Sequence, residues 1–336
     1  MMKFSTKTAI MTVVTLIISV SSAARGTWSV EVEKALGLIS PEKLQHEVSF
    51  LSDTLCKGRA TGTRGNIEAA FWINRKFEKA GLECLNGSYG NRFTTPTGAI
   101  AHNVLGMLPG AYSMPRERYI IVGAHFDHLG TLNGQTYPGA DANASGTVAL
   151  TSLSEIFCAM REMGKVYDSN IVFVAFDAKE MDMSGSQALW KLIEYGMLKD
   201  PLTGASITSD KISLMVNIDQ VGSTLSPIRS SRKDYLIMLG NDSLPKDKRD
   251  NLEFLNEWHK TGLDLCLSYY GSKAFTDVFY RLSDQRVFVD NKIPAVMFTS
   301  GITMNTNKTR DNAASLDYTV LQKRITLIYH WIESML

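Results

Sequence analysis

Cysteine is scarce in this 336-residue chain, and no two cysteines form a Cys-x-x-Cys pair. The four that occur are widely spaced, at positions 56, 84, 158 and 266. Zinc held by cysteine is therefore not expected, and we interpret these residues as small side chains of the interior. An exported protein could join them in disulfides, but four cysteines allow more than one pairing and the sequence does not choose among them.

Net charge is also nearly absent, because 35 lysines and arginines stand against 34 aspartates and glutamates. A protein whose main partner is nucleic acid needs a basic face to neutralise phosphates, so nucleic acid is not expected as a partner. Glycine and proline are few, at 25 and 9 residues, and hydrophobic residues make up 44%. These values exclude a disordered, collagen-like or coiled-coil chain and predict one large hydrophobic core.

One uncharged apolar run, Ala9 to Val20, lies near the N-terminus. Two lysines precede it and small residues follow it at 22–24, which is the order of a secretory signal peptide. A membrane-spanning helix needs about 20 apolar residues, and this run is shorter. We therefore expect residues 1–23 to be a signal peptide and the protein to be exported, periplasmic or secreted, with no stable membrane anchor.

Downstream of this segment, strand and helix patterns alternate. Continuous apolar runs, typical of buried strands, cover 119–124, 171–176 and 212–218, with shorter runs at 235–239 and 295–298. Helical spacing of apolar residues covers 41–53, 66–80, 145–163, 186–197 and 321–332. Continuous apolar strands separated by helices imply a largely parallel sheet covered on both faces. We therefore predict one α/β sandwich domain over residues 24–336.

Ionisable residues follow each of the three long strand runs. His125 and Asp127 follow the first, Lys179 and Glu180 follow the second, and Asp219 follows the third. A further polar segment lies between the first strand and the next helix, and it reads Gly139-Ala140-Asp141-Ala142-Asn143-Ala144-Ser145-Gly146. In open α/β sheets, ligands gather beyond the carboxyl ends of the strands.

Each of these residues also has an ordinary structural interpretation. Asp141, Asn143 and Ser145 suit the N-cap of a helix, and a His-x-Asp pair occurs on many surfaces. One histidine and three carboxylates at successive strand ends are nevertheless hard to explain by packing. Imidazole and carboxylate together suit zinc in a site with an open position. Residues 125 and 127 share a face of an extended chain, so Asp127 could accept a hydrogen bond from the His125 ring and fix its tautomer.

These segments resemble the motifs of exported zinc aminopeptidases of the bacterial leucyl aminopeptidase type, whose relatives include glutamate carboxypeptidase and glutaminyl cyclase. The matching motifs are His125-Phe126-Asp127, residues 139–146, Lys179-Glu180 and Asn217-Ile218-Asp219. The resemblance covers roughly residues 45–320. It implies a three-layer α/β sandwich with a mostly parallel mixed central sheet. It also implies a hydrolase that removes N-terminal residues from peptides or small amino-acyl substrates.

In this family two zinc ions share a bridging aspartate. The resemblance implies that Asp141 is the bridge, that His125 and Asp219 complete the ligands of one ion, and that Glu180 binds the other. It makes Asp127 the residue that orients His125.

Two positions depart from the family pattern. The general base of the family is a glutamate, and Lys179 stands in its place. An ammonium group cannot accept a proton from metal-bound water, and neighbouring carboxylates would raise its pKa further. The last family ligand is a histidine, and Asn307 stands there, although an amide oxygen is a poor zinc ligand beside imidazole. Ala142 and Gln285 replace a further acid and histidine of the family.

These departures fall on one half of the expected metal site. Our first hypothesis is an impaired or one-metal aminopeptidase in which Glu180, freed from ligation, acts as the base. The alternative is a non-catalytic pseudopeptidase, in which Lys179 neutralises the acids and the cleft binds peptides without cutting them, with no zinc at all. The sequence leaves side-chain preference and oligomeric state undetermined.

Overall fold

The computed structural model describes residues 29–111, 118–225, 233–269 and 271–336. The predicted signal peptide, residues 1–23, lies outside the described residues. Within the described ranges, no helix has both the length and the apolar character needed to span a bilayer. The four cysteines are all free, with Cys56 and Cys158 buried and Cys84 and Cys266 partly buried.

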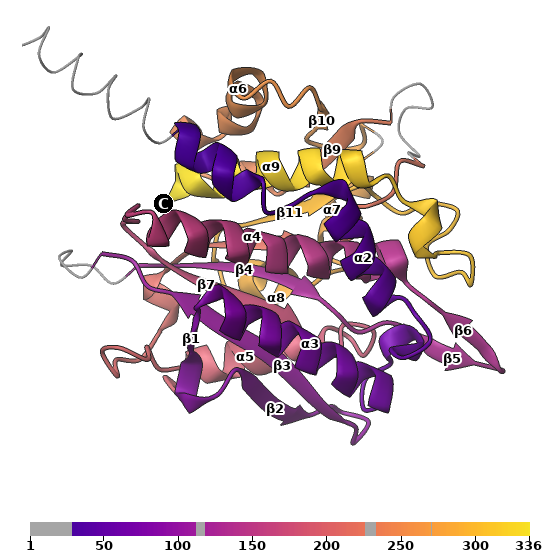
Figure 1. Cartoon of the computed structure of the whole chain (residues 1–336). Helices are drawn as coiled ribbons and strands as arrows, with labels where there is room; N and C mark the ends of the chain where they lie inside the picture. The colour runs from indigo at the N-terminus through magenta and orange to yellow at the C-terminus, as the bar shows by residue number, and fades with distance from the viewer. Residues whose placement is uncertain (1–28, 112–117, 226–232, 270) are drawn as a thin grey trace, which may run out of the picture.

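In the described ranges, nine strands form one mixed sheet at the centre of the molecule (Figure 1). Its middle is parallel and consists, in spatial order, of β7 (Asn170–Phe176), β4 (Tyr119–His125), β8 (Ile212–Ile218) and β11 (Ala295–Thr299). On one side, β3 (Ile100–Leu108) runs antiparallel to β7 and carries β1 (Glu83–Cys84) and β2 (Gly90–Thr94). On the other side lie β9 (Tyr235–Leu239), antiparallel to β11, and β10 (Asp264–Cys266). A separate hairpin joins β5 (Gly130–Leu132) to β6 (Gln135–Tyr137).

Helices cover both faces of this sheet. One face carries α2 (Pro41–Leu51), α3 (Arg64–Ala80), α4 (Gly146–Glu162) and α9 (Tyr318–Met335), and Figure 1 shows α4 and α9 lying across it. The other face carries α5 (Ser184–Glu194) and α8 (Arg286–Asp290), and the remaining helices are α6 (Asn251–Trp258), beside α9, and α7 (Lys273–Tyr280). The predicted three-layer sandwich with a mostly parallel mixed sheet is therefore confirmed.

The two cores explain why the central strands are apolar throughout. Alternate residues of β4 point to opposite faces, so that Val122 packs in the core under α4 and α9 whereas Ile121 packs in the core under α5 and α8. In β7, Phe173 and Val174 divide in the same way. A strand buried on both faces has no polar side, and this is the continuous pattern that the sequence displays.

The strand predictions for 119–124, 171–176, 212–218, 235–239 and 295–298 each match a strand to within a residue or two, and the five predicted helices match α2, α3, α4, α5 and α9. The nine-residue strand β3 was not predicted. Its sequence is interrupted by His102, Asn103 and Gly106, because β3 contacts solvent at one end and packs closely at the other. Asn103 is buried, and its amide donates to the Gly185 carbonyl oxygen at 2.8 Å.

The glycine-rich stretch 58–65 places a fully buried arginine beside the ends of the central strands. The Arg59 guanidinium donates hydrogen bonds of 2.6–2.8 Å to four carbonyl oxygens, those of Leu51, Phe126, Pro138 and Gly139. It thus ties the end of α2 to the segments that follow β4 and β6. Gly58 has a φ of 70°, which glycine adopts readily, and the tight turn at this residue directs the Arg59 side chain into the interior.

We expect Arg59→Met to lower the free energy of unfolding by about 3 kcal/mol or more, because it removes the donor to four carbonyl oxygens, of which only the Gly139 oxygen keeps another, the Ala144 N–H. Urea denaturation followed by circular dichroism measures the loss. Arg64→Met is the matched control, because the Arg64 side chain is 91% exposed and its loss should cost less than about 0.5 kcal/mol. Equal stability of the two variants would contradict this role.

Candidate functional site

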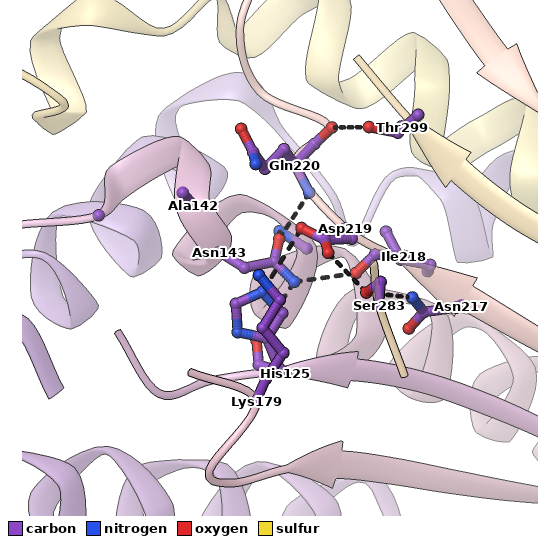
Figure 2. A network of polar contacts seen from close by, with 12 residues as sticks. His125, Ala142, Asn143, Lys179, Asn217, Ile218, Asp219, Gln220, Ser283 and Thr299 are labelled. Atoms are coloured by element: carbon purple, nitrogen blue, oxygen red, sulfur yellow. Dashed lines mark hydrogen bonds and ion pairs between the residues drawn. The ribbon is translucent and has the colours of Figure 1, made fainter. Parts of the chain in front are cut away.

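The predicted site residues gather at the carboxyl ends of the central parallel strands. His125 is the last residue of β4, Lys179 and Glu180 follow β7, and Asp219 follows β8. Asp141 lies in the turn 140–145 that leads into α4. Figure 2 shows His125, Lys179 and Asp219 close together around Asn143. Parallel strands explain this convergence, since all their carboxyl ends meet at one edge.

The Asn143 side chain holds two of these strand ends together. Its Nδ2 donates to the carbonyl oxygens of His125 (3.2 Å) and Ile218 (2.9 Å), and its Oδ1 accepts from the N–H groups of Gly146 (3.1 Å) and Gln220 (2.8 Å) (Figure 2). The residue is completely buried. Every hydrogen bond that a primary amide readily makes is therefore used, and the ends of β4 and β8 are fixed relative to the start of α4.

His125 faces Asp219 across the ends of β4 and β8. Its Nε2 lies 3.4 Å from Asp219 Oδ1, and neither atom has a hydrogen-bond partner within the described residues. Burial acts to lower the pKa of His125, but the Asp219 charge outweighs it and the pKa rises to about 10. Burial acts to raise the pKa of Asp219, but the charges of Lys179 and His125 hold it well below its usual value.

Asp127 fixes the chain that carries Lys179 and Glu180. Its carboxylate accepts the N–H groups of Lys179 (2.9 Å) and Glu180 (3.0 Å). His125 Nδ1 lies 3.1 Å from the Asp127 main-chain oxygen and 3.6 Å from its carboxylate. We expected the His125 ring to donate a hydrogen bond to the Asp127 carboxylate. In the structure the ring instead lies within hydrogen-bonding distance of the Asp127 main-chain oxygen, and the carboxylate accepts the N–H groups of the segment after β7. Asp127 orients His125 through its backbone.

Asp141 has one bound and one free carboxylate oxygen. Oδ1 accepts from the N–H groups of Gly222 (2.8 Å) and Ser223 (3.1 Å), whereas Oδ2 has no partner within the described residues. Burial, together with the Asp311 charge, raises the pKa of Asp141 to about 7. The Asp311 carboxylate in turn accepts the N–H groups of Asp141 (2.9 Å) and Ala142 (3.1 Å).

Lys179 is largely buried among carboxylates. Its Nζ donates to Glu180 Oε1 at 3.3 Å. Burial acts to lower the pKa of this ammonium group, but the charges of Asp219, Glu180 and Asp127 outweigh it and raise the pKa above its ordinary value. Lys179 therefore stays protonated at neutral pH and cannot accept a proton.

Lys179, Glu180 and Asp219 line a cleft of about 290 Å³. Ala142 and Asn307 line it too. Asn307 is exposed at the rim, in a left-handed conformation with φ 58°. The apolar lining of the cleft consists of Leu239, Tyr269, Phe279, Leu282, Met297 and Ile302. A small apolar cleft with a few convergent polar groups is the usual form of a ligand site.

Two groups that the sequence pattern did not single out complete the site. Ser283 Oγ donates to Asp219 Oδ2 at 2.6 Å and accepts from Asn217 Nδ2 at 2.8 Å. Asp284 is fully buried, neither of its oxygens has a partner within the described residues, and burial raises its pKa to about 7. Both residues precede α8, far from the strand-end motifs in sequence, and a Ser-Asp pair in a loop carries no signal of its own.

The donor set at this edge suits a metal ion in part. Two ligands of one tetrahedral zinc, each at about 2.0–2.1 Å from it, stand about 3.3 Å apart, close to the distance between His125 Nε2 and Asp219 Oδ1. The free Oδ2 of Asp141 is a third donor. In the described part of the chain, however, no three His, Cys, Asp or Glu side chains are arranged as a closed metal site. The types of donor therefore fit zinc, but their arrangement in this structure is not that of a complete site.

Residues 103–332 match the sequence profile of peptidase family M28, which is more than half of the chain. The chain belongs to peptidase family M28. No curated protein matches the sequence significantly.

Solved structures of two aminopeptidases, one of them a zinc enzyme, and of a glutaminyl cyclase share this fold. The aminopeptidase LapA of Legionella pneumophila aligns over 90% of this chain and 74% of its own, with 18% identity and a TM-score of 0.65. BSAP, a zinc aminopeptidase from Bacillus subtilis, aligns over 88% and 95%, with 13% identity and a TM-score of 0.64. The glutaminyl cyclase of Porphyromonas gingivalis aligns over 89% and 99%, with 14% identity and a TM-score of 0.63.

We expect Asn143→Asp to destabilise this M28 protein by about 2–4 kcal/mol, because a carboxylate cannot donate to the His125 and Ile218 carbonyl oxygens. Urea denaturation at pH 7 measures the change. Asn133→Asp, in the exposed turn between β5 and β6, serves as the control and should lie within about 0.5 kcal/mol of the unchanged protein. A loss shared by both variants would contradict the assignment.

The buried His128 gives the protein a pH dependence of known sign. Both ring nitrogens lack partners within the described residues, and burial with the Arg59 charge lowers its pKa to about 2. Gly139, at φ 58°, packs against the ring so closely that a Cβ there would come within 2.4 Å of it. Between about pH 2 and about 6.5 the unfolded chain binds a proton here that the native chain does not.

His128 therefore contributes stability above about pH 6.5 that is lost, by about 1.4 kcal/mol per unit, as the pH falls. We expect His128→Gln to flatten the fall in unfolding free energy between pH 6.5 and 5. Urea denaturation at several pH values measures both slopes, and His46→Gln, on the exposed side of α2, is the control. An unchanged slope in His128→Gln would show that this ring is already protonated in the native state.

Proposed function

We propose that this M28 protein binds a single zinc ion through His125, Asp141 and Asp219 and removes N-terminal residues from peptides at an impaired rate. The observation that supports this most is the set of three buried polar atoms without a hydrogen-bond partner within the described residues: His125 Nε2, Asp141 Oδ2 and Asp219 Oδ1. Buried polar atoms are normally satisfied, so three unsatisfied ones at one strand edge point to a ligand. The zinc aminopeptidases that share the fold make zinc the expected ligand.

When bound, zinc would polarise a peptide carbonyl and lower the pKa of its water to about 7. The remaining roles in the reaction are carried out by side chains of the protein. Glu180 lines the cleft, and we assign it the role of proton acceptor. Lys179 remains an ammonium ion and holds the Glu180 carboxylate through the 3.3 Å hydrogen bond. The apolar wall around Phe279 and Leu282 would take a side chain of the peptide and exclude water from it.

The second zinc position of the family has no counterpart in the donor set. Ala142 and Asn307 line the cleft where further ligands would be needed, and the Lys179 charge repels a second cation. The charge stabilisation that a second metal ion would give the transition state is then absent. Slow turnover follows from these residues even with one zinc bound.

The position of Lys179 also supports the second candidate, a peptide-binding pseudopeptidase without zinc. Its ammonium group already balances the charges of Asp219, Glu180 and Asp127. Lys179 can thus neutralise these carboxylates as a metal ion would, but it provides no activated water molecule for hydrolysis. The same cleft would then bind a peptide and release it unchanged.

Metal content separates the two candidates. After zinc loading and desalting, elemental mass spectrometry should find about one zinc per chain, since one His and two Asp with water complete a tetrahedral site. His125→Ala should lose the metal, whereas His46→Ala, on the exposed side of α2, should keep it. Absence of zinc, or equal retention by His125→Ala, would favour the pseudopeptidase.

Two further variants test the roles of the cleft residues in the same assay. Glu180→Gln should retain zinc and lower peptide turnover by about 10²-fold or more. Turnover that stays unchanged would exclude Glu180 as the base. The double variant Lys179→Glu with Asn307→His should raise the zinc content above one, because it removes the repelling charge and restores two ligand types.

Export remains part of the proposal and depends on residues 1–23. We propose that these residues are removed and that residues 24–336 act as one domain in the periplasm or outside the cell, on peptides and without nucleic acid or a membrane anchor. Mass spectrometry of the N-terminus of the exported protein tests the cleavage site.

A further inference from the structure

Four large apolar side chains in or beside the lining of the strand-end cleft are exposed to solvent. We call them the apolar rim, and they are Phe275 (54% exposed), Leu282 (53%), Ile302 (42%) and Met304 (70%). Leu282 and Ile302 line the cleft itself. Single exposed apolar residues are normal on a protein surface, but several that gather beside one cleft mark a binding surface. The proposed function uses Leu282 and gives the other three no role.

Phe275 extends the apolar lining of the cleft along α7. It precedes Phe279, which lines the cleft, by four residues, so the two side chains lie on the same face of the helix. The charged residues of α7, Lys273 and Asp277, pair with each other at 3.0 Å and line a different cavity. Within α7, the face that continues the cleft is therefore uncharged.

The loop that follows β11 brings Ile302 and Met304 to the same cleft. Ile302 and Thr306 both line it, and Met304 lies between them in the chain. Tyr269 connects this loop to α7, because its hydroxyl accepts the Ile302 N–H at 2.7 Å and its ring centroid lies 4.1 Å from that of Phe279. The loop and α7 thus border one opening.

The cleft is too small to enclose more than the beginning of a peptide. Its volume of about 290 Å³ is at the lower end of the range for ligand pockets. The remainder of a bound peptide must therefore leave the cleft and lie on the surface beside it. Apolar side chains in that part of the peptide would cover the apolar rim, and removing both apolar surfaces from water favours binding.

The position and composition of the apolar rim favour a peptide over an unrelated partner. A peptide whose first residue is held in the cleft keeps its next residues beside the rim at a high effective concentration, an advantage that a separate partner lacks. Met304 is the most exposed of the four residues. Methionine is unbranched and adapts to partners of different shape, so it suits a surface that receives varied sequences.

We propose that the apolar rim binds the residues that follow the first residue of a bound peptide. The preferred ligand is then a peptide with several apolar residues in its N-terminal segment, rather than a small amino-acyl compound. This inference rests on the proposed binding of peptides in the strand-end cleft. It applies to the one-zinc enzyme and to the pseudopeptidase alike, because it concerns binding and not cleavage.

Fluorescence anisotropy of two peptides that carry a label at the C-terminus tests this. Both begin with leucine, which is followed by leucine, valine and leucine in the apolar peptide and by serine, asparagine and serine in the polar peptide. Under the same zinc conditions, the chain from residue 24 should bind the apolar peptide about tenfold more tightly, because only its side chains bury the apolar rim. Leucine amide, which fills the cleft alone, should displace both peptides.

Substitutions in the apolar rim should change this preference. Phe275→Ser with Met304→Ser should remove most of it and leave the affinity for the polar peptide unchanged. Met304→Ser alone, at an exposed site, should lower the affinity for the apolar peptide by about threefold. Val166→Ser with Leu202→Ser replaces two apolar residues that are exposed outside the cleft, so this matched control should keep the full preference.

The outcomes separate this inference from the proposed function. Equal binding of the two peptides, or a preference that survives Phe275→Ser with Met304→Ser, would overturn the inference and leave the proposed function standing. So would apolar-peptide binding that leucine amide does not displace. A dimer that the double variant converts to monomer in sedimentation would also overturn it, because a second copy would then cover the rim. Binding of neither peptide, with zinc or with a chelator, would overturn the proposed function and this inference with it.

Discussion

The amide of Asn143 is the constraint on which the strand-end site depends. It bonds the ends of β4 and β8 and the start of α4 at the same time, and it is completely buried. His125 and Asp219 face each other because these two strand ends are held in register by one side chain. A carboxylate could not replace it, since two of its four partners are acceptors. The position of every other polar group at this edge is set relative to that frame.

Charge balance is the second organising feature. The acids at this edge are gathered from separate strand ends, and gathering them is unfavourable unless a cation lies among them. In this chain Lys179 is such a cation, and its raised pKa reflects the carboxylates around it. Lys179 is part of both proposed functions. The one-zinc enzyme would add a metal ion beside it, whereas the pseudopeptidase would rely on Lys179 alone.

The central strands and the polar residues at their ends could be predicted from the sequence. A strand that is buried on both faces has an uninterrupted apolar run, and this run stops where the site begins. In β4 the neighbouring residues Ile121 and Val122 each pack in a different core, and this apolar run stops at His125. In β8 the corresponding run is followed directly by Asp219. Strand β3, which lies between β7 and the outer strands β1 and β2, could not be predicted, since His102 and Asn103 interrupt its apolar pattern. Asp284 and Ser283 were not accessible either, because their role comes from a contact between loops distant in sequence, and such contacts leave no local pattern.

The link between Asp311 and the turn at residues 141–142 has a consequence for how the protein is made. The two ends of this contact are 170 residues apart, and the Asp311 carboxylate alone accepts the Asp141 and Ala142 N–H groups. During synthesis or translocation, β4, β7 and β8 are all complete before Asp311 emerges. The turn that carries Asp141 stays without its anchor until nearly the whole chain is available. A nascent or C-terminally shortened chain thus has a sheet before it has a finished site, which delays any hydrolytic capacity until the protein is whole.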